Sequence, residues 1–251
     1  MIFSKRPQAK TGFDKDSPRS EGCLVCGQEL VYSQTSSIAK CLVCGKSQST
    51  QTQCRSGHFI CDACHVGDIL QNIESLLISS TESDPVILAR RIFELPRLNL
   101  HGPEYHSIVP AVLIAAFQNQ TGKRCVEDIS EAIRRGKSIQ GGSCGLHGNC
   151  GAGVGAGIAV SIIEDATPMT GQPRSDANRA TAMALLAISE HVGPRCCKRD
   201  AITSIKSFIK STPYFPDQLD TPYICGQFNR NRSCIGSSCP FFKTNKEKPD
   251  A

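Results

Sequence analysis

The sequence has no tryptophan, and aromatic residues make up only 6% of its 251 residues. Aliphatic and small side chains must therefore supply most of the packing in any core. The longest apolar run, residues 151–163, is shorter than the roughly 20 residues that a membrane-spanning helix needs. The first 20 residues are polar and lack the apolar stretch of a secretory signal. We therefore expect a soluble, cytoplasmic protein that does not associate with a membrane.

The sequence also lacks a strong excess of one charge. Its formal net charge is +5, and the two ends of the chain contribute much of it. A protein that binds nucleic acid usually concentrates its basic residues in a patch or stripe. We therefore do not expect nucleic acid among its partners.

Cysteine is unusually abundant, with 15 residues in the sequence. The number is odd, and many of the cysteines form C-x-x-C pairs. A disulfide framework requires an oxidising compartment and is usually found in shorter chains. Metal ligation in a reducing cytoplasm is the better interpretation of this pattern.

The pattern of residues predicts a mainly α protein in four segments. Residues 1–20 read as a disordered tail, and residues 21–66 as a double zinc-binding module with short β-hairpins. Residues 67–242 form an α-helical domain with a cysteine-rich C-terminal loop region, and residues 243–251 form a second tail. Within the helical domain, Asp84 followed by Pro85 is a typical helix start, and we expect Asp176 to cap a later helix. Apolar residues recur at helical spacing in residues 69–77, 88–95, 108–117, 126–135, 151–163, 180–188 and 202–209.

The N-terminal segment contains eight candidate metal ligands. A tetrahedral zinc site needs four nitrogen or sulfur ligands, and a C-x-x-C pair brings two thiolates to one tight turn. Eight ligands therefore predict two zinc ions, each with every coordination position filled by protein, as in structural sites. These ligands are Cys23, Cys26, Cys41, Cys44, Cys54, His58, Cys61 and Cys64.

The ligands can pair in two ways. In a sequential arrangement, the first two C-x-x-C pairs share one ion and the remaining four ligands share the other. In a crossed arrangement, Cys41 and Cys44 join Cys61 and Cys64, and the other ion takes Cys23, Cys26, Cys54 and His58. We slightly favour the crossed arrangement, because residues 54–64 form a short span in which to close four ligands around one ion.

A second thiolate site is expected in the helical domain. A glycine-rich stretch, residues 140–153, places two thiols and His147 in one loop, where dense glycine lets the backbone approach an ion or cofactor closely. Cysteines near the C-terminus are loosely spaced, and a proline follows the last, as in some iron–sulfur proteins. An iron–sulfur cluster, another zinc ion and a reactive thiol pair all remain open. The candidate ligands are Cys144, Cys150, Cys196, Cys225, Cys234 and Cys239.

Two further groups suggest chemistry. Cys197 adjoins Cys196 at a predicted helix start beside three basic residues, which should lower a thiol pKa. Because neighbouring side chains diverge, we expect one of the two cysteines to be a ligand or buried and the other to be reactive. His101, Glu104 and His106 gather in one predicted turn and could serve in acid–base chemistry or bind a metal. Exposed histidines in a helix-capping turn are an equally good interpretation.

Four phrases together resemble a prokaryotic, cysteine-rich family of unknown function. They are CRSGHFICDACH, LHGPEYH, GGSCGLHGNCGAGVGAGI and GPRCCKRDA, and the resemblance covers about residues 21–242. Members of that family occur in anaerobes, alone or attached to S-adenosylmethionine-dependent methyltransferase domains. The resemblance implies an anaerobic cytoplasmic setting and a role in methyl or sulfur transfer, with a methyltransferase or another redox or sulfur-transfer protein as partner. It brings no established activity, and this sequence contains no recognisable methyltransferase domain.

Two functional hypotheses follow. The first is a metal–sulfur protein with two structural zinc ions and a second thiolate site. That site would hold an iron–sulfur cluster and act in redox, sulfur-transfer or methyl-transfer chemistry. The second is an adaptor without enzymatic activity, whose zinc module holds a protein or nucleic acid. Loss of Cys144 would leave the adaptor unaffected and would damage the metal–sulfur enzyme.

Overall fold

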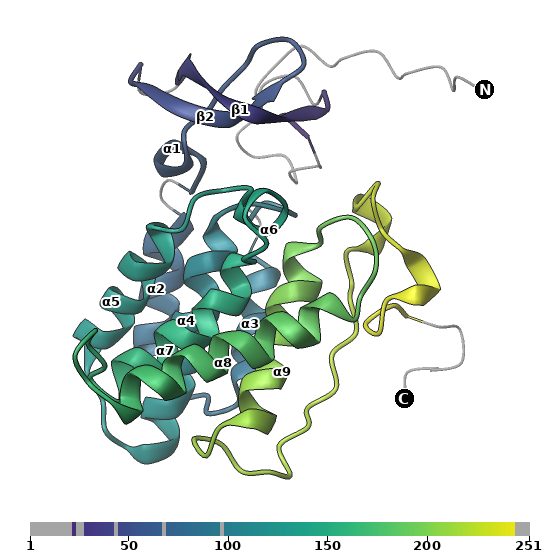
Figure 1. Cartoon of the computed structure of the whole chain (residues 1–251). Coiled ribbons are helices and arrows are strands. Elements are labelled where there is room, and N and C mark those ends of the chain that lie inside the picture. Colours follow the sequence, from purple (N-terminus) through teal and green to yellow (C-terminus); the bar gives the residue numbers. More distant parts are fainter. Residues whose placement is uncertain (1–21, 24–27, 43–44, 67–68, 96–97, 244–251) are drawn as a thin grey trace.

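The computed structural model describes residues 22–23, 28–42, 45–66, 69–95 and 98–243. Its N-terminal part is a two-stranded antiparallel sheet of β1 (Leu30–Lys40) and β2 (Ser47–Cys54). The strands pair from Leu30 with Cys54 to Lys40 with Ser47, and the register shifts between Tyr32 and Ser37. Figure 1 shows this hairpin and the short α1 (Asp62–Val66) above one end of a helical body.

The rest of the described chain is helical, as the sequence predicted. A short α6 covers the end of the body that faces the hairpin, and two 3-10 turns lie in the C-terminal segment at its side (Figure 1). None of the described helices is long and apolar enough to cross a membrane. The elements after α1 are α2 (Ile69–Ser79), α3 (Pro85–Phe93), α4 (Glu104–Thr121), α5 (Val126–Lys137), α6 (Ser143–Leu146), α7 (Gly151–Ile163), α8 (Gln172–Ser189), α9 (Cys197–Ser211), η1 (Phe228–Arg230) and η2 (Gly236–Ser238).

The start of α3 follows directly from its sequence. The Asp84 carboxylate accepts hydrogen bonds from the backbone N–H groups of Val86 at 2.8 Å and Ile87 at 3.2 Å. Pro85 occupies the first turn, where its missing N–H costs nothing. The sequence prediction of this helix start is therefore confirmed.

The glycines of α7 allow helices to pack closely. A β-carbon at Gly155 would lie 2.8 Å from Pro110 Cδ of α4, and one at Gly157 would lie 2.6 Å from the Ala177 carbonyl oxygen of α8. Close approach of helices explains why this run is rich in glycine and alanine.

One predicted helix start is wrong. Helix α8 begins at Gln172, so Asp176 lies inside the helix and bonds to the Gln172 amide and the Arg179 guanidinium. Pro173 in the first turn supplies the fixed backbone angle that suits a helix start. Pro173 therefore marks the start of α8, although Asp176 is also a residue type that is common at helix starts.

Two separate apolar clusters stabilise the chain. The larger lies among the helices, and its largest fully buried side chains include Tyr105, Phe208 and Leu113. The smaller lies in the N-terminal part and consists of Ala39, Phe59, Cys41 and Cys61, flanked by Ile60 and Cys64. Half of this smaller cluster is cysteine, so the N-terminal part has little apolar core of its own.

Candidate metal centres

The first candidate centre joins the end of β2 to the chain before β1. Cys23 Sγ, Cys54 Sγ and a ring nitrogen of His58 all lie within 4.8 Å of one another. Cys23 Sγ is 3.8 Å from His58 Nδ1. A tight turn at Gly57, whose φ is +81°, brings His58 back beside Cys54. The proposed fourth ligand, Cys26, lies outside the described residues.

The second candidate centre joins the end of β1 to α1. Sulfur atoms of Cys41, Cys61 and Cys64 lie within 4.8 Å of one another, and the Cys61 N–H donates to Cys41 Sγ at 3.3 Å. The proposed fourth ligand, Cys44, again lies outside the described residues. In both centres the described ligands group as in the crossed arrangement and not as in the sequential one. These two Cys/His clusters could each hold a metal ion.

Helix α1 connects the second centre to the helical body. Its Asp62 carboxylate accepts a hydrogen bond from the Gly141 N–H at 3.0 Å. His65 Nδ1 lies 3.5 Å from the Glu104 carboxylate at the start of α4, and 3.4 Å from the Asn99 amide. Asp62 directly follows the ligand Cys61, and His65 directly follows the ligand Cys64. The geometry of the second centre therefore also fixes how α1 docks on the helical body.

Glu104 is fully buried. Burial alone would raise its pKa, but the interaction with His65, 3.5 Å away, holds the pKa below its ordinary value. Among the described residues, neither carboxylate oxygen has a partner at good hydrogen-bond geometry. Gly102 must be a glycine here, because a β-carbon would lie 2.0 Å from the Glu104 carboxylate and 2.7 Å from His65 Cε1. The carboxylate is therefore a negatively charged anchor for α1.

The three polar residues of the 101–106 turn contact different neighbours. Glu104 faces His65, whereas His106 Nδ1 donates to the Ile139 carbonyl at 3.0 Å. Burial lowers the pKa of His106, which keeps its ring neutral. His101 Nδ1 accepts from the Cys197 N–H at 3.4 Å, so its Nε2 carries the hydrogen that faces Asn231 Oδ1, also at 3.4 Å.

The glycine-rich loop divides its two thiols. Cys144 lies in α6, Cys150 caps the start of α7, and His147 is exposed between them. Burial, with the nearby Asp200 charge, raises the pKa of Cys150 to about 12. In the described part of the chain, only the two N-terminal groups bring three metal-ligating atoms within 4.8 Å of one another. Cys144, His147 and Cys150 therefore do not form a third compact group.

The expected low pKa of the Cys196–Cys197 pair is wrong. Burial raises the pKa of Cys197 well above its ordinary value, although the Arg195 charge opposes this. Burial also raises the pKa of Cys196 to about 11. Removal of the thiolates from water outweighs the helix start and the adjacent cations, which was not readable without the packing. The two side chains do diverge, since Cys197 packs against the helical core and Cys196 faces a separate cavity.

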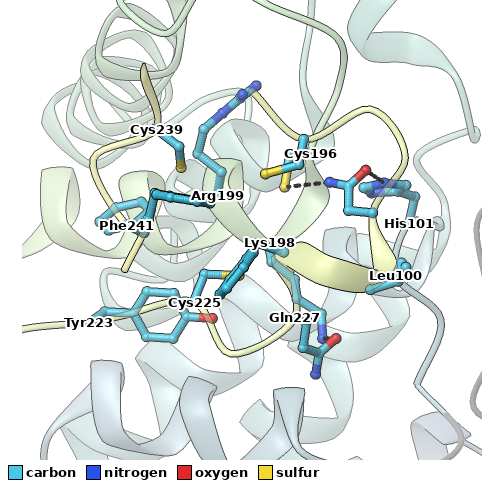
Figure 2. A pocket seen from close by; sticks show the side chains of 14 residues that line it. Leu100, His101, Cys196, Lys198, Arg199, Tyr223, Cys225, Gln227, Cys239 and Phe241 are labelled. Carbon is cyan, nitrogen blue, oxygen red and sulfur yellow. Dashed lines mark hydrogen bonds between the residues drawn. The ribbon is translucent and has the colours of Figure 1, made fainter. Parts of the chain in front are cut away.

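Four of the remaining cysteines line that cavity, which measures about 30 Å³. Cys196 comes from the start of α9, and Cys225, Cys234 and Cys239 come from the segment that follows α9. This segment folds back on itself, with the Cys225 N–H bonded to the Phe241 carbonyl at 2.7 Å. Figure 2 shows Cys196, Cys225 and Cys239 around the cavity, with Lys198 beside them.

Two buried cations flank these thiols. Lys198 is 3% exposed, and its ammonium donates to the Phe93 carbonyl at 3.1 Å and to the Gln227 amide oxygen. Burial lowers its pKa to about 8, against the effect of the neighbouring cysteines. Arg199 is 5% exposed and pairs with Asp200 at 3.1 Å. The sequence showed both cations, but only as charges near a thiol and not as walls of a four-cysteine cavity.

A second, larger cavity of about 120 Å³ lies between the hairpin and the helical body. Asp62, His65 and His101 line it, together with Arg195. The Arg195 guanidinium lies 5.6 Å from the centre of the Tyr32 ring and so bridges the two parts of the chain. Sequence reasoning missed Arg195 in this role and Asn231 beside His101, because each depends on contacts between distant segments.

Comparison with known proteins identifies a family. Neither the search of curated proteins nor the search of solved structures returned a significant match. The model of a family of unknown function, DUF5714, matches residues 73–242, which include α4 to α9 and the four-cysteine cavity. This match covers more than half of the chain, so the protein belongs to the DUF5714 family of unknown function.

Proposed function

We propose that this is a metal–sulfur protein in which two structural zinc ions hold the N-terminal module. A thiolate site in the helical domain would hold an iron–sulfur cofactor. The observation that carries the proposal is the grouping of six buried or part-buried ligands into two sets, each within 4.8 Å. Soft thiolates and one imidazole are the donors that zinc prefers.

The N-terminal sites fit structural zinc by their ligand number. With Cys26 and Cys44 as fourth ligands, one site has three sulfurs and one nitrogen, and the other has four sulfurs. Four protein ligands leave no open position for a substrate, so the ions would stabilise the fold and not react. The small apolar core of this module supports the same role, because metal binding supplies folding energy where a core cannot.

The chemistry of the protein would take place in the helical domain. Its thiols support redox, sulfur-transfer or methyl-transfer-associated reactions, with a methyltransferase or another redox or sulfur-transfer protein as partner. The described cysteines of the helical domain form no disulfide with one another. Thiols of this number are compatible with a reducing cytoplasm and with an anaerobic setting.

Metal analysis of the full-length protein, purified without oxygen, tests the zinc assignment. We expect about two zinc ions per chain, from two closed four-ligand sites. Cys54→Ser and Cys61→Ser should each reduce this to about one, because they belong to different sites. Cys125→Ser is the matched control and should retain both ions, since Cys125 lies apart from both groups. Zinc-free wild-type protein, or retention of both ions in the two variants, would contradict the assignment.

A second candidate function is a binding adaptor without catalysis. The observation in its favour is the exposed apolar surface of the N-terminal module, where Ile38 is 74% and Leu42 58% exposed. Such side chains are often interface residues. An adaptor would keep its cellular role when the thiols of the helical domain are replaced by serine, and would lose it in Ile38→Asp. The metal–sulfur function predicts the reverse.

A further inference from the structure

The strongest unassigned feature of the helical domain is the set of four thiols around the 30 Å³ cavity. We propose that Cys196, Cys225, Cys234 and Cys239 together ligate one four-iron iron–sulfur cluster. This inference rests on the proposed function, and it names the ligands of the thiolate site. It also removes Cys144 and Cys150 from the ligand set that the sequence suggested.

The four sulfurs of the cavity are not grouped as tightly as the ligands of the N-terminal centres. Around one zinc ion with bonds of about 2.3 Å, tetrahedral geometry places the sulfurs roughly 3.8 Å apart. In both N-terminal groups the described ligand atoms lie within 4.8 Å of one another. Among the described residues, no other three ligand atoms all lie within 4.8 Å of one another. The same is therefore true of any three of these four sulfurs. A four-iron cluster is wider than one ion, so its four thiolates line a shared cavity without converging on a single point.

Backbone and side-chain N–H groups point at the sulfurs as they do in the N-terminal centres. In the first of those centres, the Ser56 N–H donates to Cys54 Sγ, two residues back, at 3.3 Å. The Gly236 N–H donates in the same way to Cys234 Sγ at 3.4 Å. The Phe241 N–H favours the Cys239 thiolate, again across two residues. Such N–H donors stabilise ligating thiolates and tune the potential of a cluster.

Cys196 has donors of two kinds. The Arg199 N–H favours its thiolate, and the Asn231 amide donates to its sulfur at 3.8 Å, as the dashed line in Figure 2 shows. Asn231 is itself oriented by His101, which lies 3.4 Å away. Asn231 is therefore a positioning residue between His101 and the sulfur of Cys196.

The charge of the site also fits. Four thiolates around a four-iron core carry a net charge of about −2 in the oxidised form, and a buried charge must be compensated. Lys198 and Arg199 are almost fully buried beside the cavity, and Asp200 offsets only one of them. A buried lysine with no anion nearby would be costly, and the thiolate centre supplies that anion.

The other thiols of the domain lie elsewhere. Cys150 and Cys197 do not line this cavity, and the nearby charge of Asp200 disfavours the thiolate form of both. Cys144 lies in α6, next to the N-terminal module. They therefore serve as controls for the four proposed ligands.

Reconstitution of the full-length protein with ferric iron, sulfide and the reductant dithiothreitol, without oxygen, tests the proposal. We expect about four iron and four sulfide per chain and broad visible absorption. Cys225→Ser, Cys234→Ser and Cys239→Ser should each lose most of the iron, while Cys144→Ser and Cys150→Ser should keep it. Zinc is measured in the same samples. Iron that stays bound in Cys225→Ser, Cys234→Ser and Cys239→Ser overturns this inference alone. Protein with zinc but without iron also overturns the iron–sulfur part of the proposed function, and the absence of both metals overturns all of it.

A milder variant guards against misfolding of the serine variants. Asn231→Ala removes one donor to the Cys196 sulfur and should leave the iron content unchanged. It should shift the reduction potential of the cluster to a more negative value, because hydrogen bonds to the sulfurs favour the reduced form. An unchanged potential would overturn the assignment. So would loss of iron in Cys144→Ser and Cys150→Ser combined with retention of iron in the three ligand variants.

Discussion

At the scale of single residues, the position of each thiol decides its chemistry. Cys196 and Cys197 are neighbours in sequence, yet one faces a cavity beside two buried cations and the other packs against the helical core. Burial raises the pKa of both thiols. Bound metal would hold the first as a thiolate, whereas the second remains a protonated, weakly reactive thiol.

The first prediction concerns the reactivity of Cys197. Burial raises its pKa well above the usual range, and each unit of pKa reduces the thiolate fraction tenfold. At pH 8, iodoacetamide should therefore modify Cys197 about 100-fold more slowly in the folded protein than in the urea-unfolded chain. Peptide mass spectrometry measures both rates. Equal rates in the two states would show that the thiol is accessible and ionised.

The second prediction concerns the contact between α4 and α5 at Gly136. A β-carbon there would lie 2.3 Å from the His106 carbonyl oxygen and 2.5 Å from Ser107 Cα, both parts of the backbone. Gly136→Ala should lower the free energy of unfolding by about 2 kcal/mol, because overpacking outweighs the better helix propensity of alanine. Gly145→Ala is the control, since no atom lies within 4 Å of its β-carbon. Urea denaturation of the two variants should separate them, and equal stability would contradict this contact.

At the scale of elements, α1 links metal binding to the helical body. Its five residues, Asp62–Val66, are too few to be stable as an isolated helix. Cys61 precedes it and Cys64 lies within it, while Asp62 and His65 contact Gly141 and Glu104. A metal ion in the second centre would therefore also order the glycine-rich loop.

The third prediction tests this link. Asp62→Ala removes the acceptor of the Gly141 N–H, a charged hydrogen bond of the kind worth about 1.5–3 kcal/mol. Amide exchange at Gly141 should accelerate at least tenfold, while the zinc content stays unchanged. The control Asp176→Ala replaces an aspartate on α8 and should leave Gly141 protected. No change at Gly141 in Asp62→Ala would show that the loop is held by other contacts.

Local signals in the sequence predicted where the helices and strands lie better than they predicted which of these elements contact one another. Asp84 and Pro85 marked the start of α3, and the spacing of the N-terminal cysteines marked the two Cys/His clusters. The start of α8 was placed too late, because Asp176 is a good cap residue but Pro173 lies earlier in the same segment. Signals of this kind depend on neighbouring residues and can be read from the chain directly.

The four-cysteine cavity could not be predicted from the sequence. The sequence pattern favoured a thiolate site around Cys144 and Cys150 in the glycine-rich loop. Nothing local shows that Cys196 meets Cys225, Cys234 and Cys239 while those two cysteines do not. Their meeting depends on the chain after α9 folding back beside the start of that helix. The low pKa expected for Cys197 failed for the same reason, because burial is a property of the whole fold.

At the scale of the whole molecule, the two parts are stabilised by different means. The helical body has an extended apolar core, whereas the N-terminal part has a small cluster in which two of four buried residues are cysteine. The core of the helical body contains no described residue before Ile69. Metal ligation should therefore dominate the stability of one part and contribute little to the core of the other.

The fourth prediction follows from this division. A strong zinc chelator under reducing conditions should unfold the N-terminal hairpin, because structural zinc supplies the folding energy of small modules. Helical circular dichroism should fall only slightly, since the larger core remains. Amide exchange should become fast in β1 and β2 and stay slow in α4, whose residues are mostly buried. A hairpin that stays protected without zinc would contradict a structural role for the metal.

The central claim is that the N-terminal module holds two zinc ions, one with three sulfur ligands and one nitrogen, and one with four sulfur ligands. X-ray absorption at the zinc edge of the full-length, anaerobically purified protein measures this directly. The account predicts an average of about 3.5 sulfur neighbours per zinc at roughly 2.3 Å, with the remaining ligand a histidine nitrogen. A shell made mainly of oxygen and nitrogen, or an average near two sulfurs, would contradict the two clusters as zinc sites.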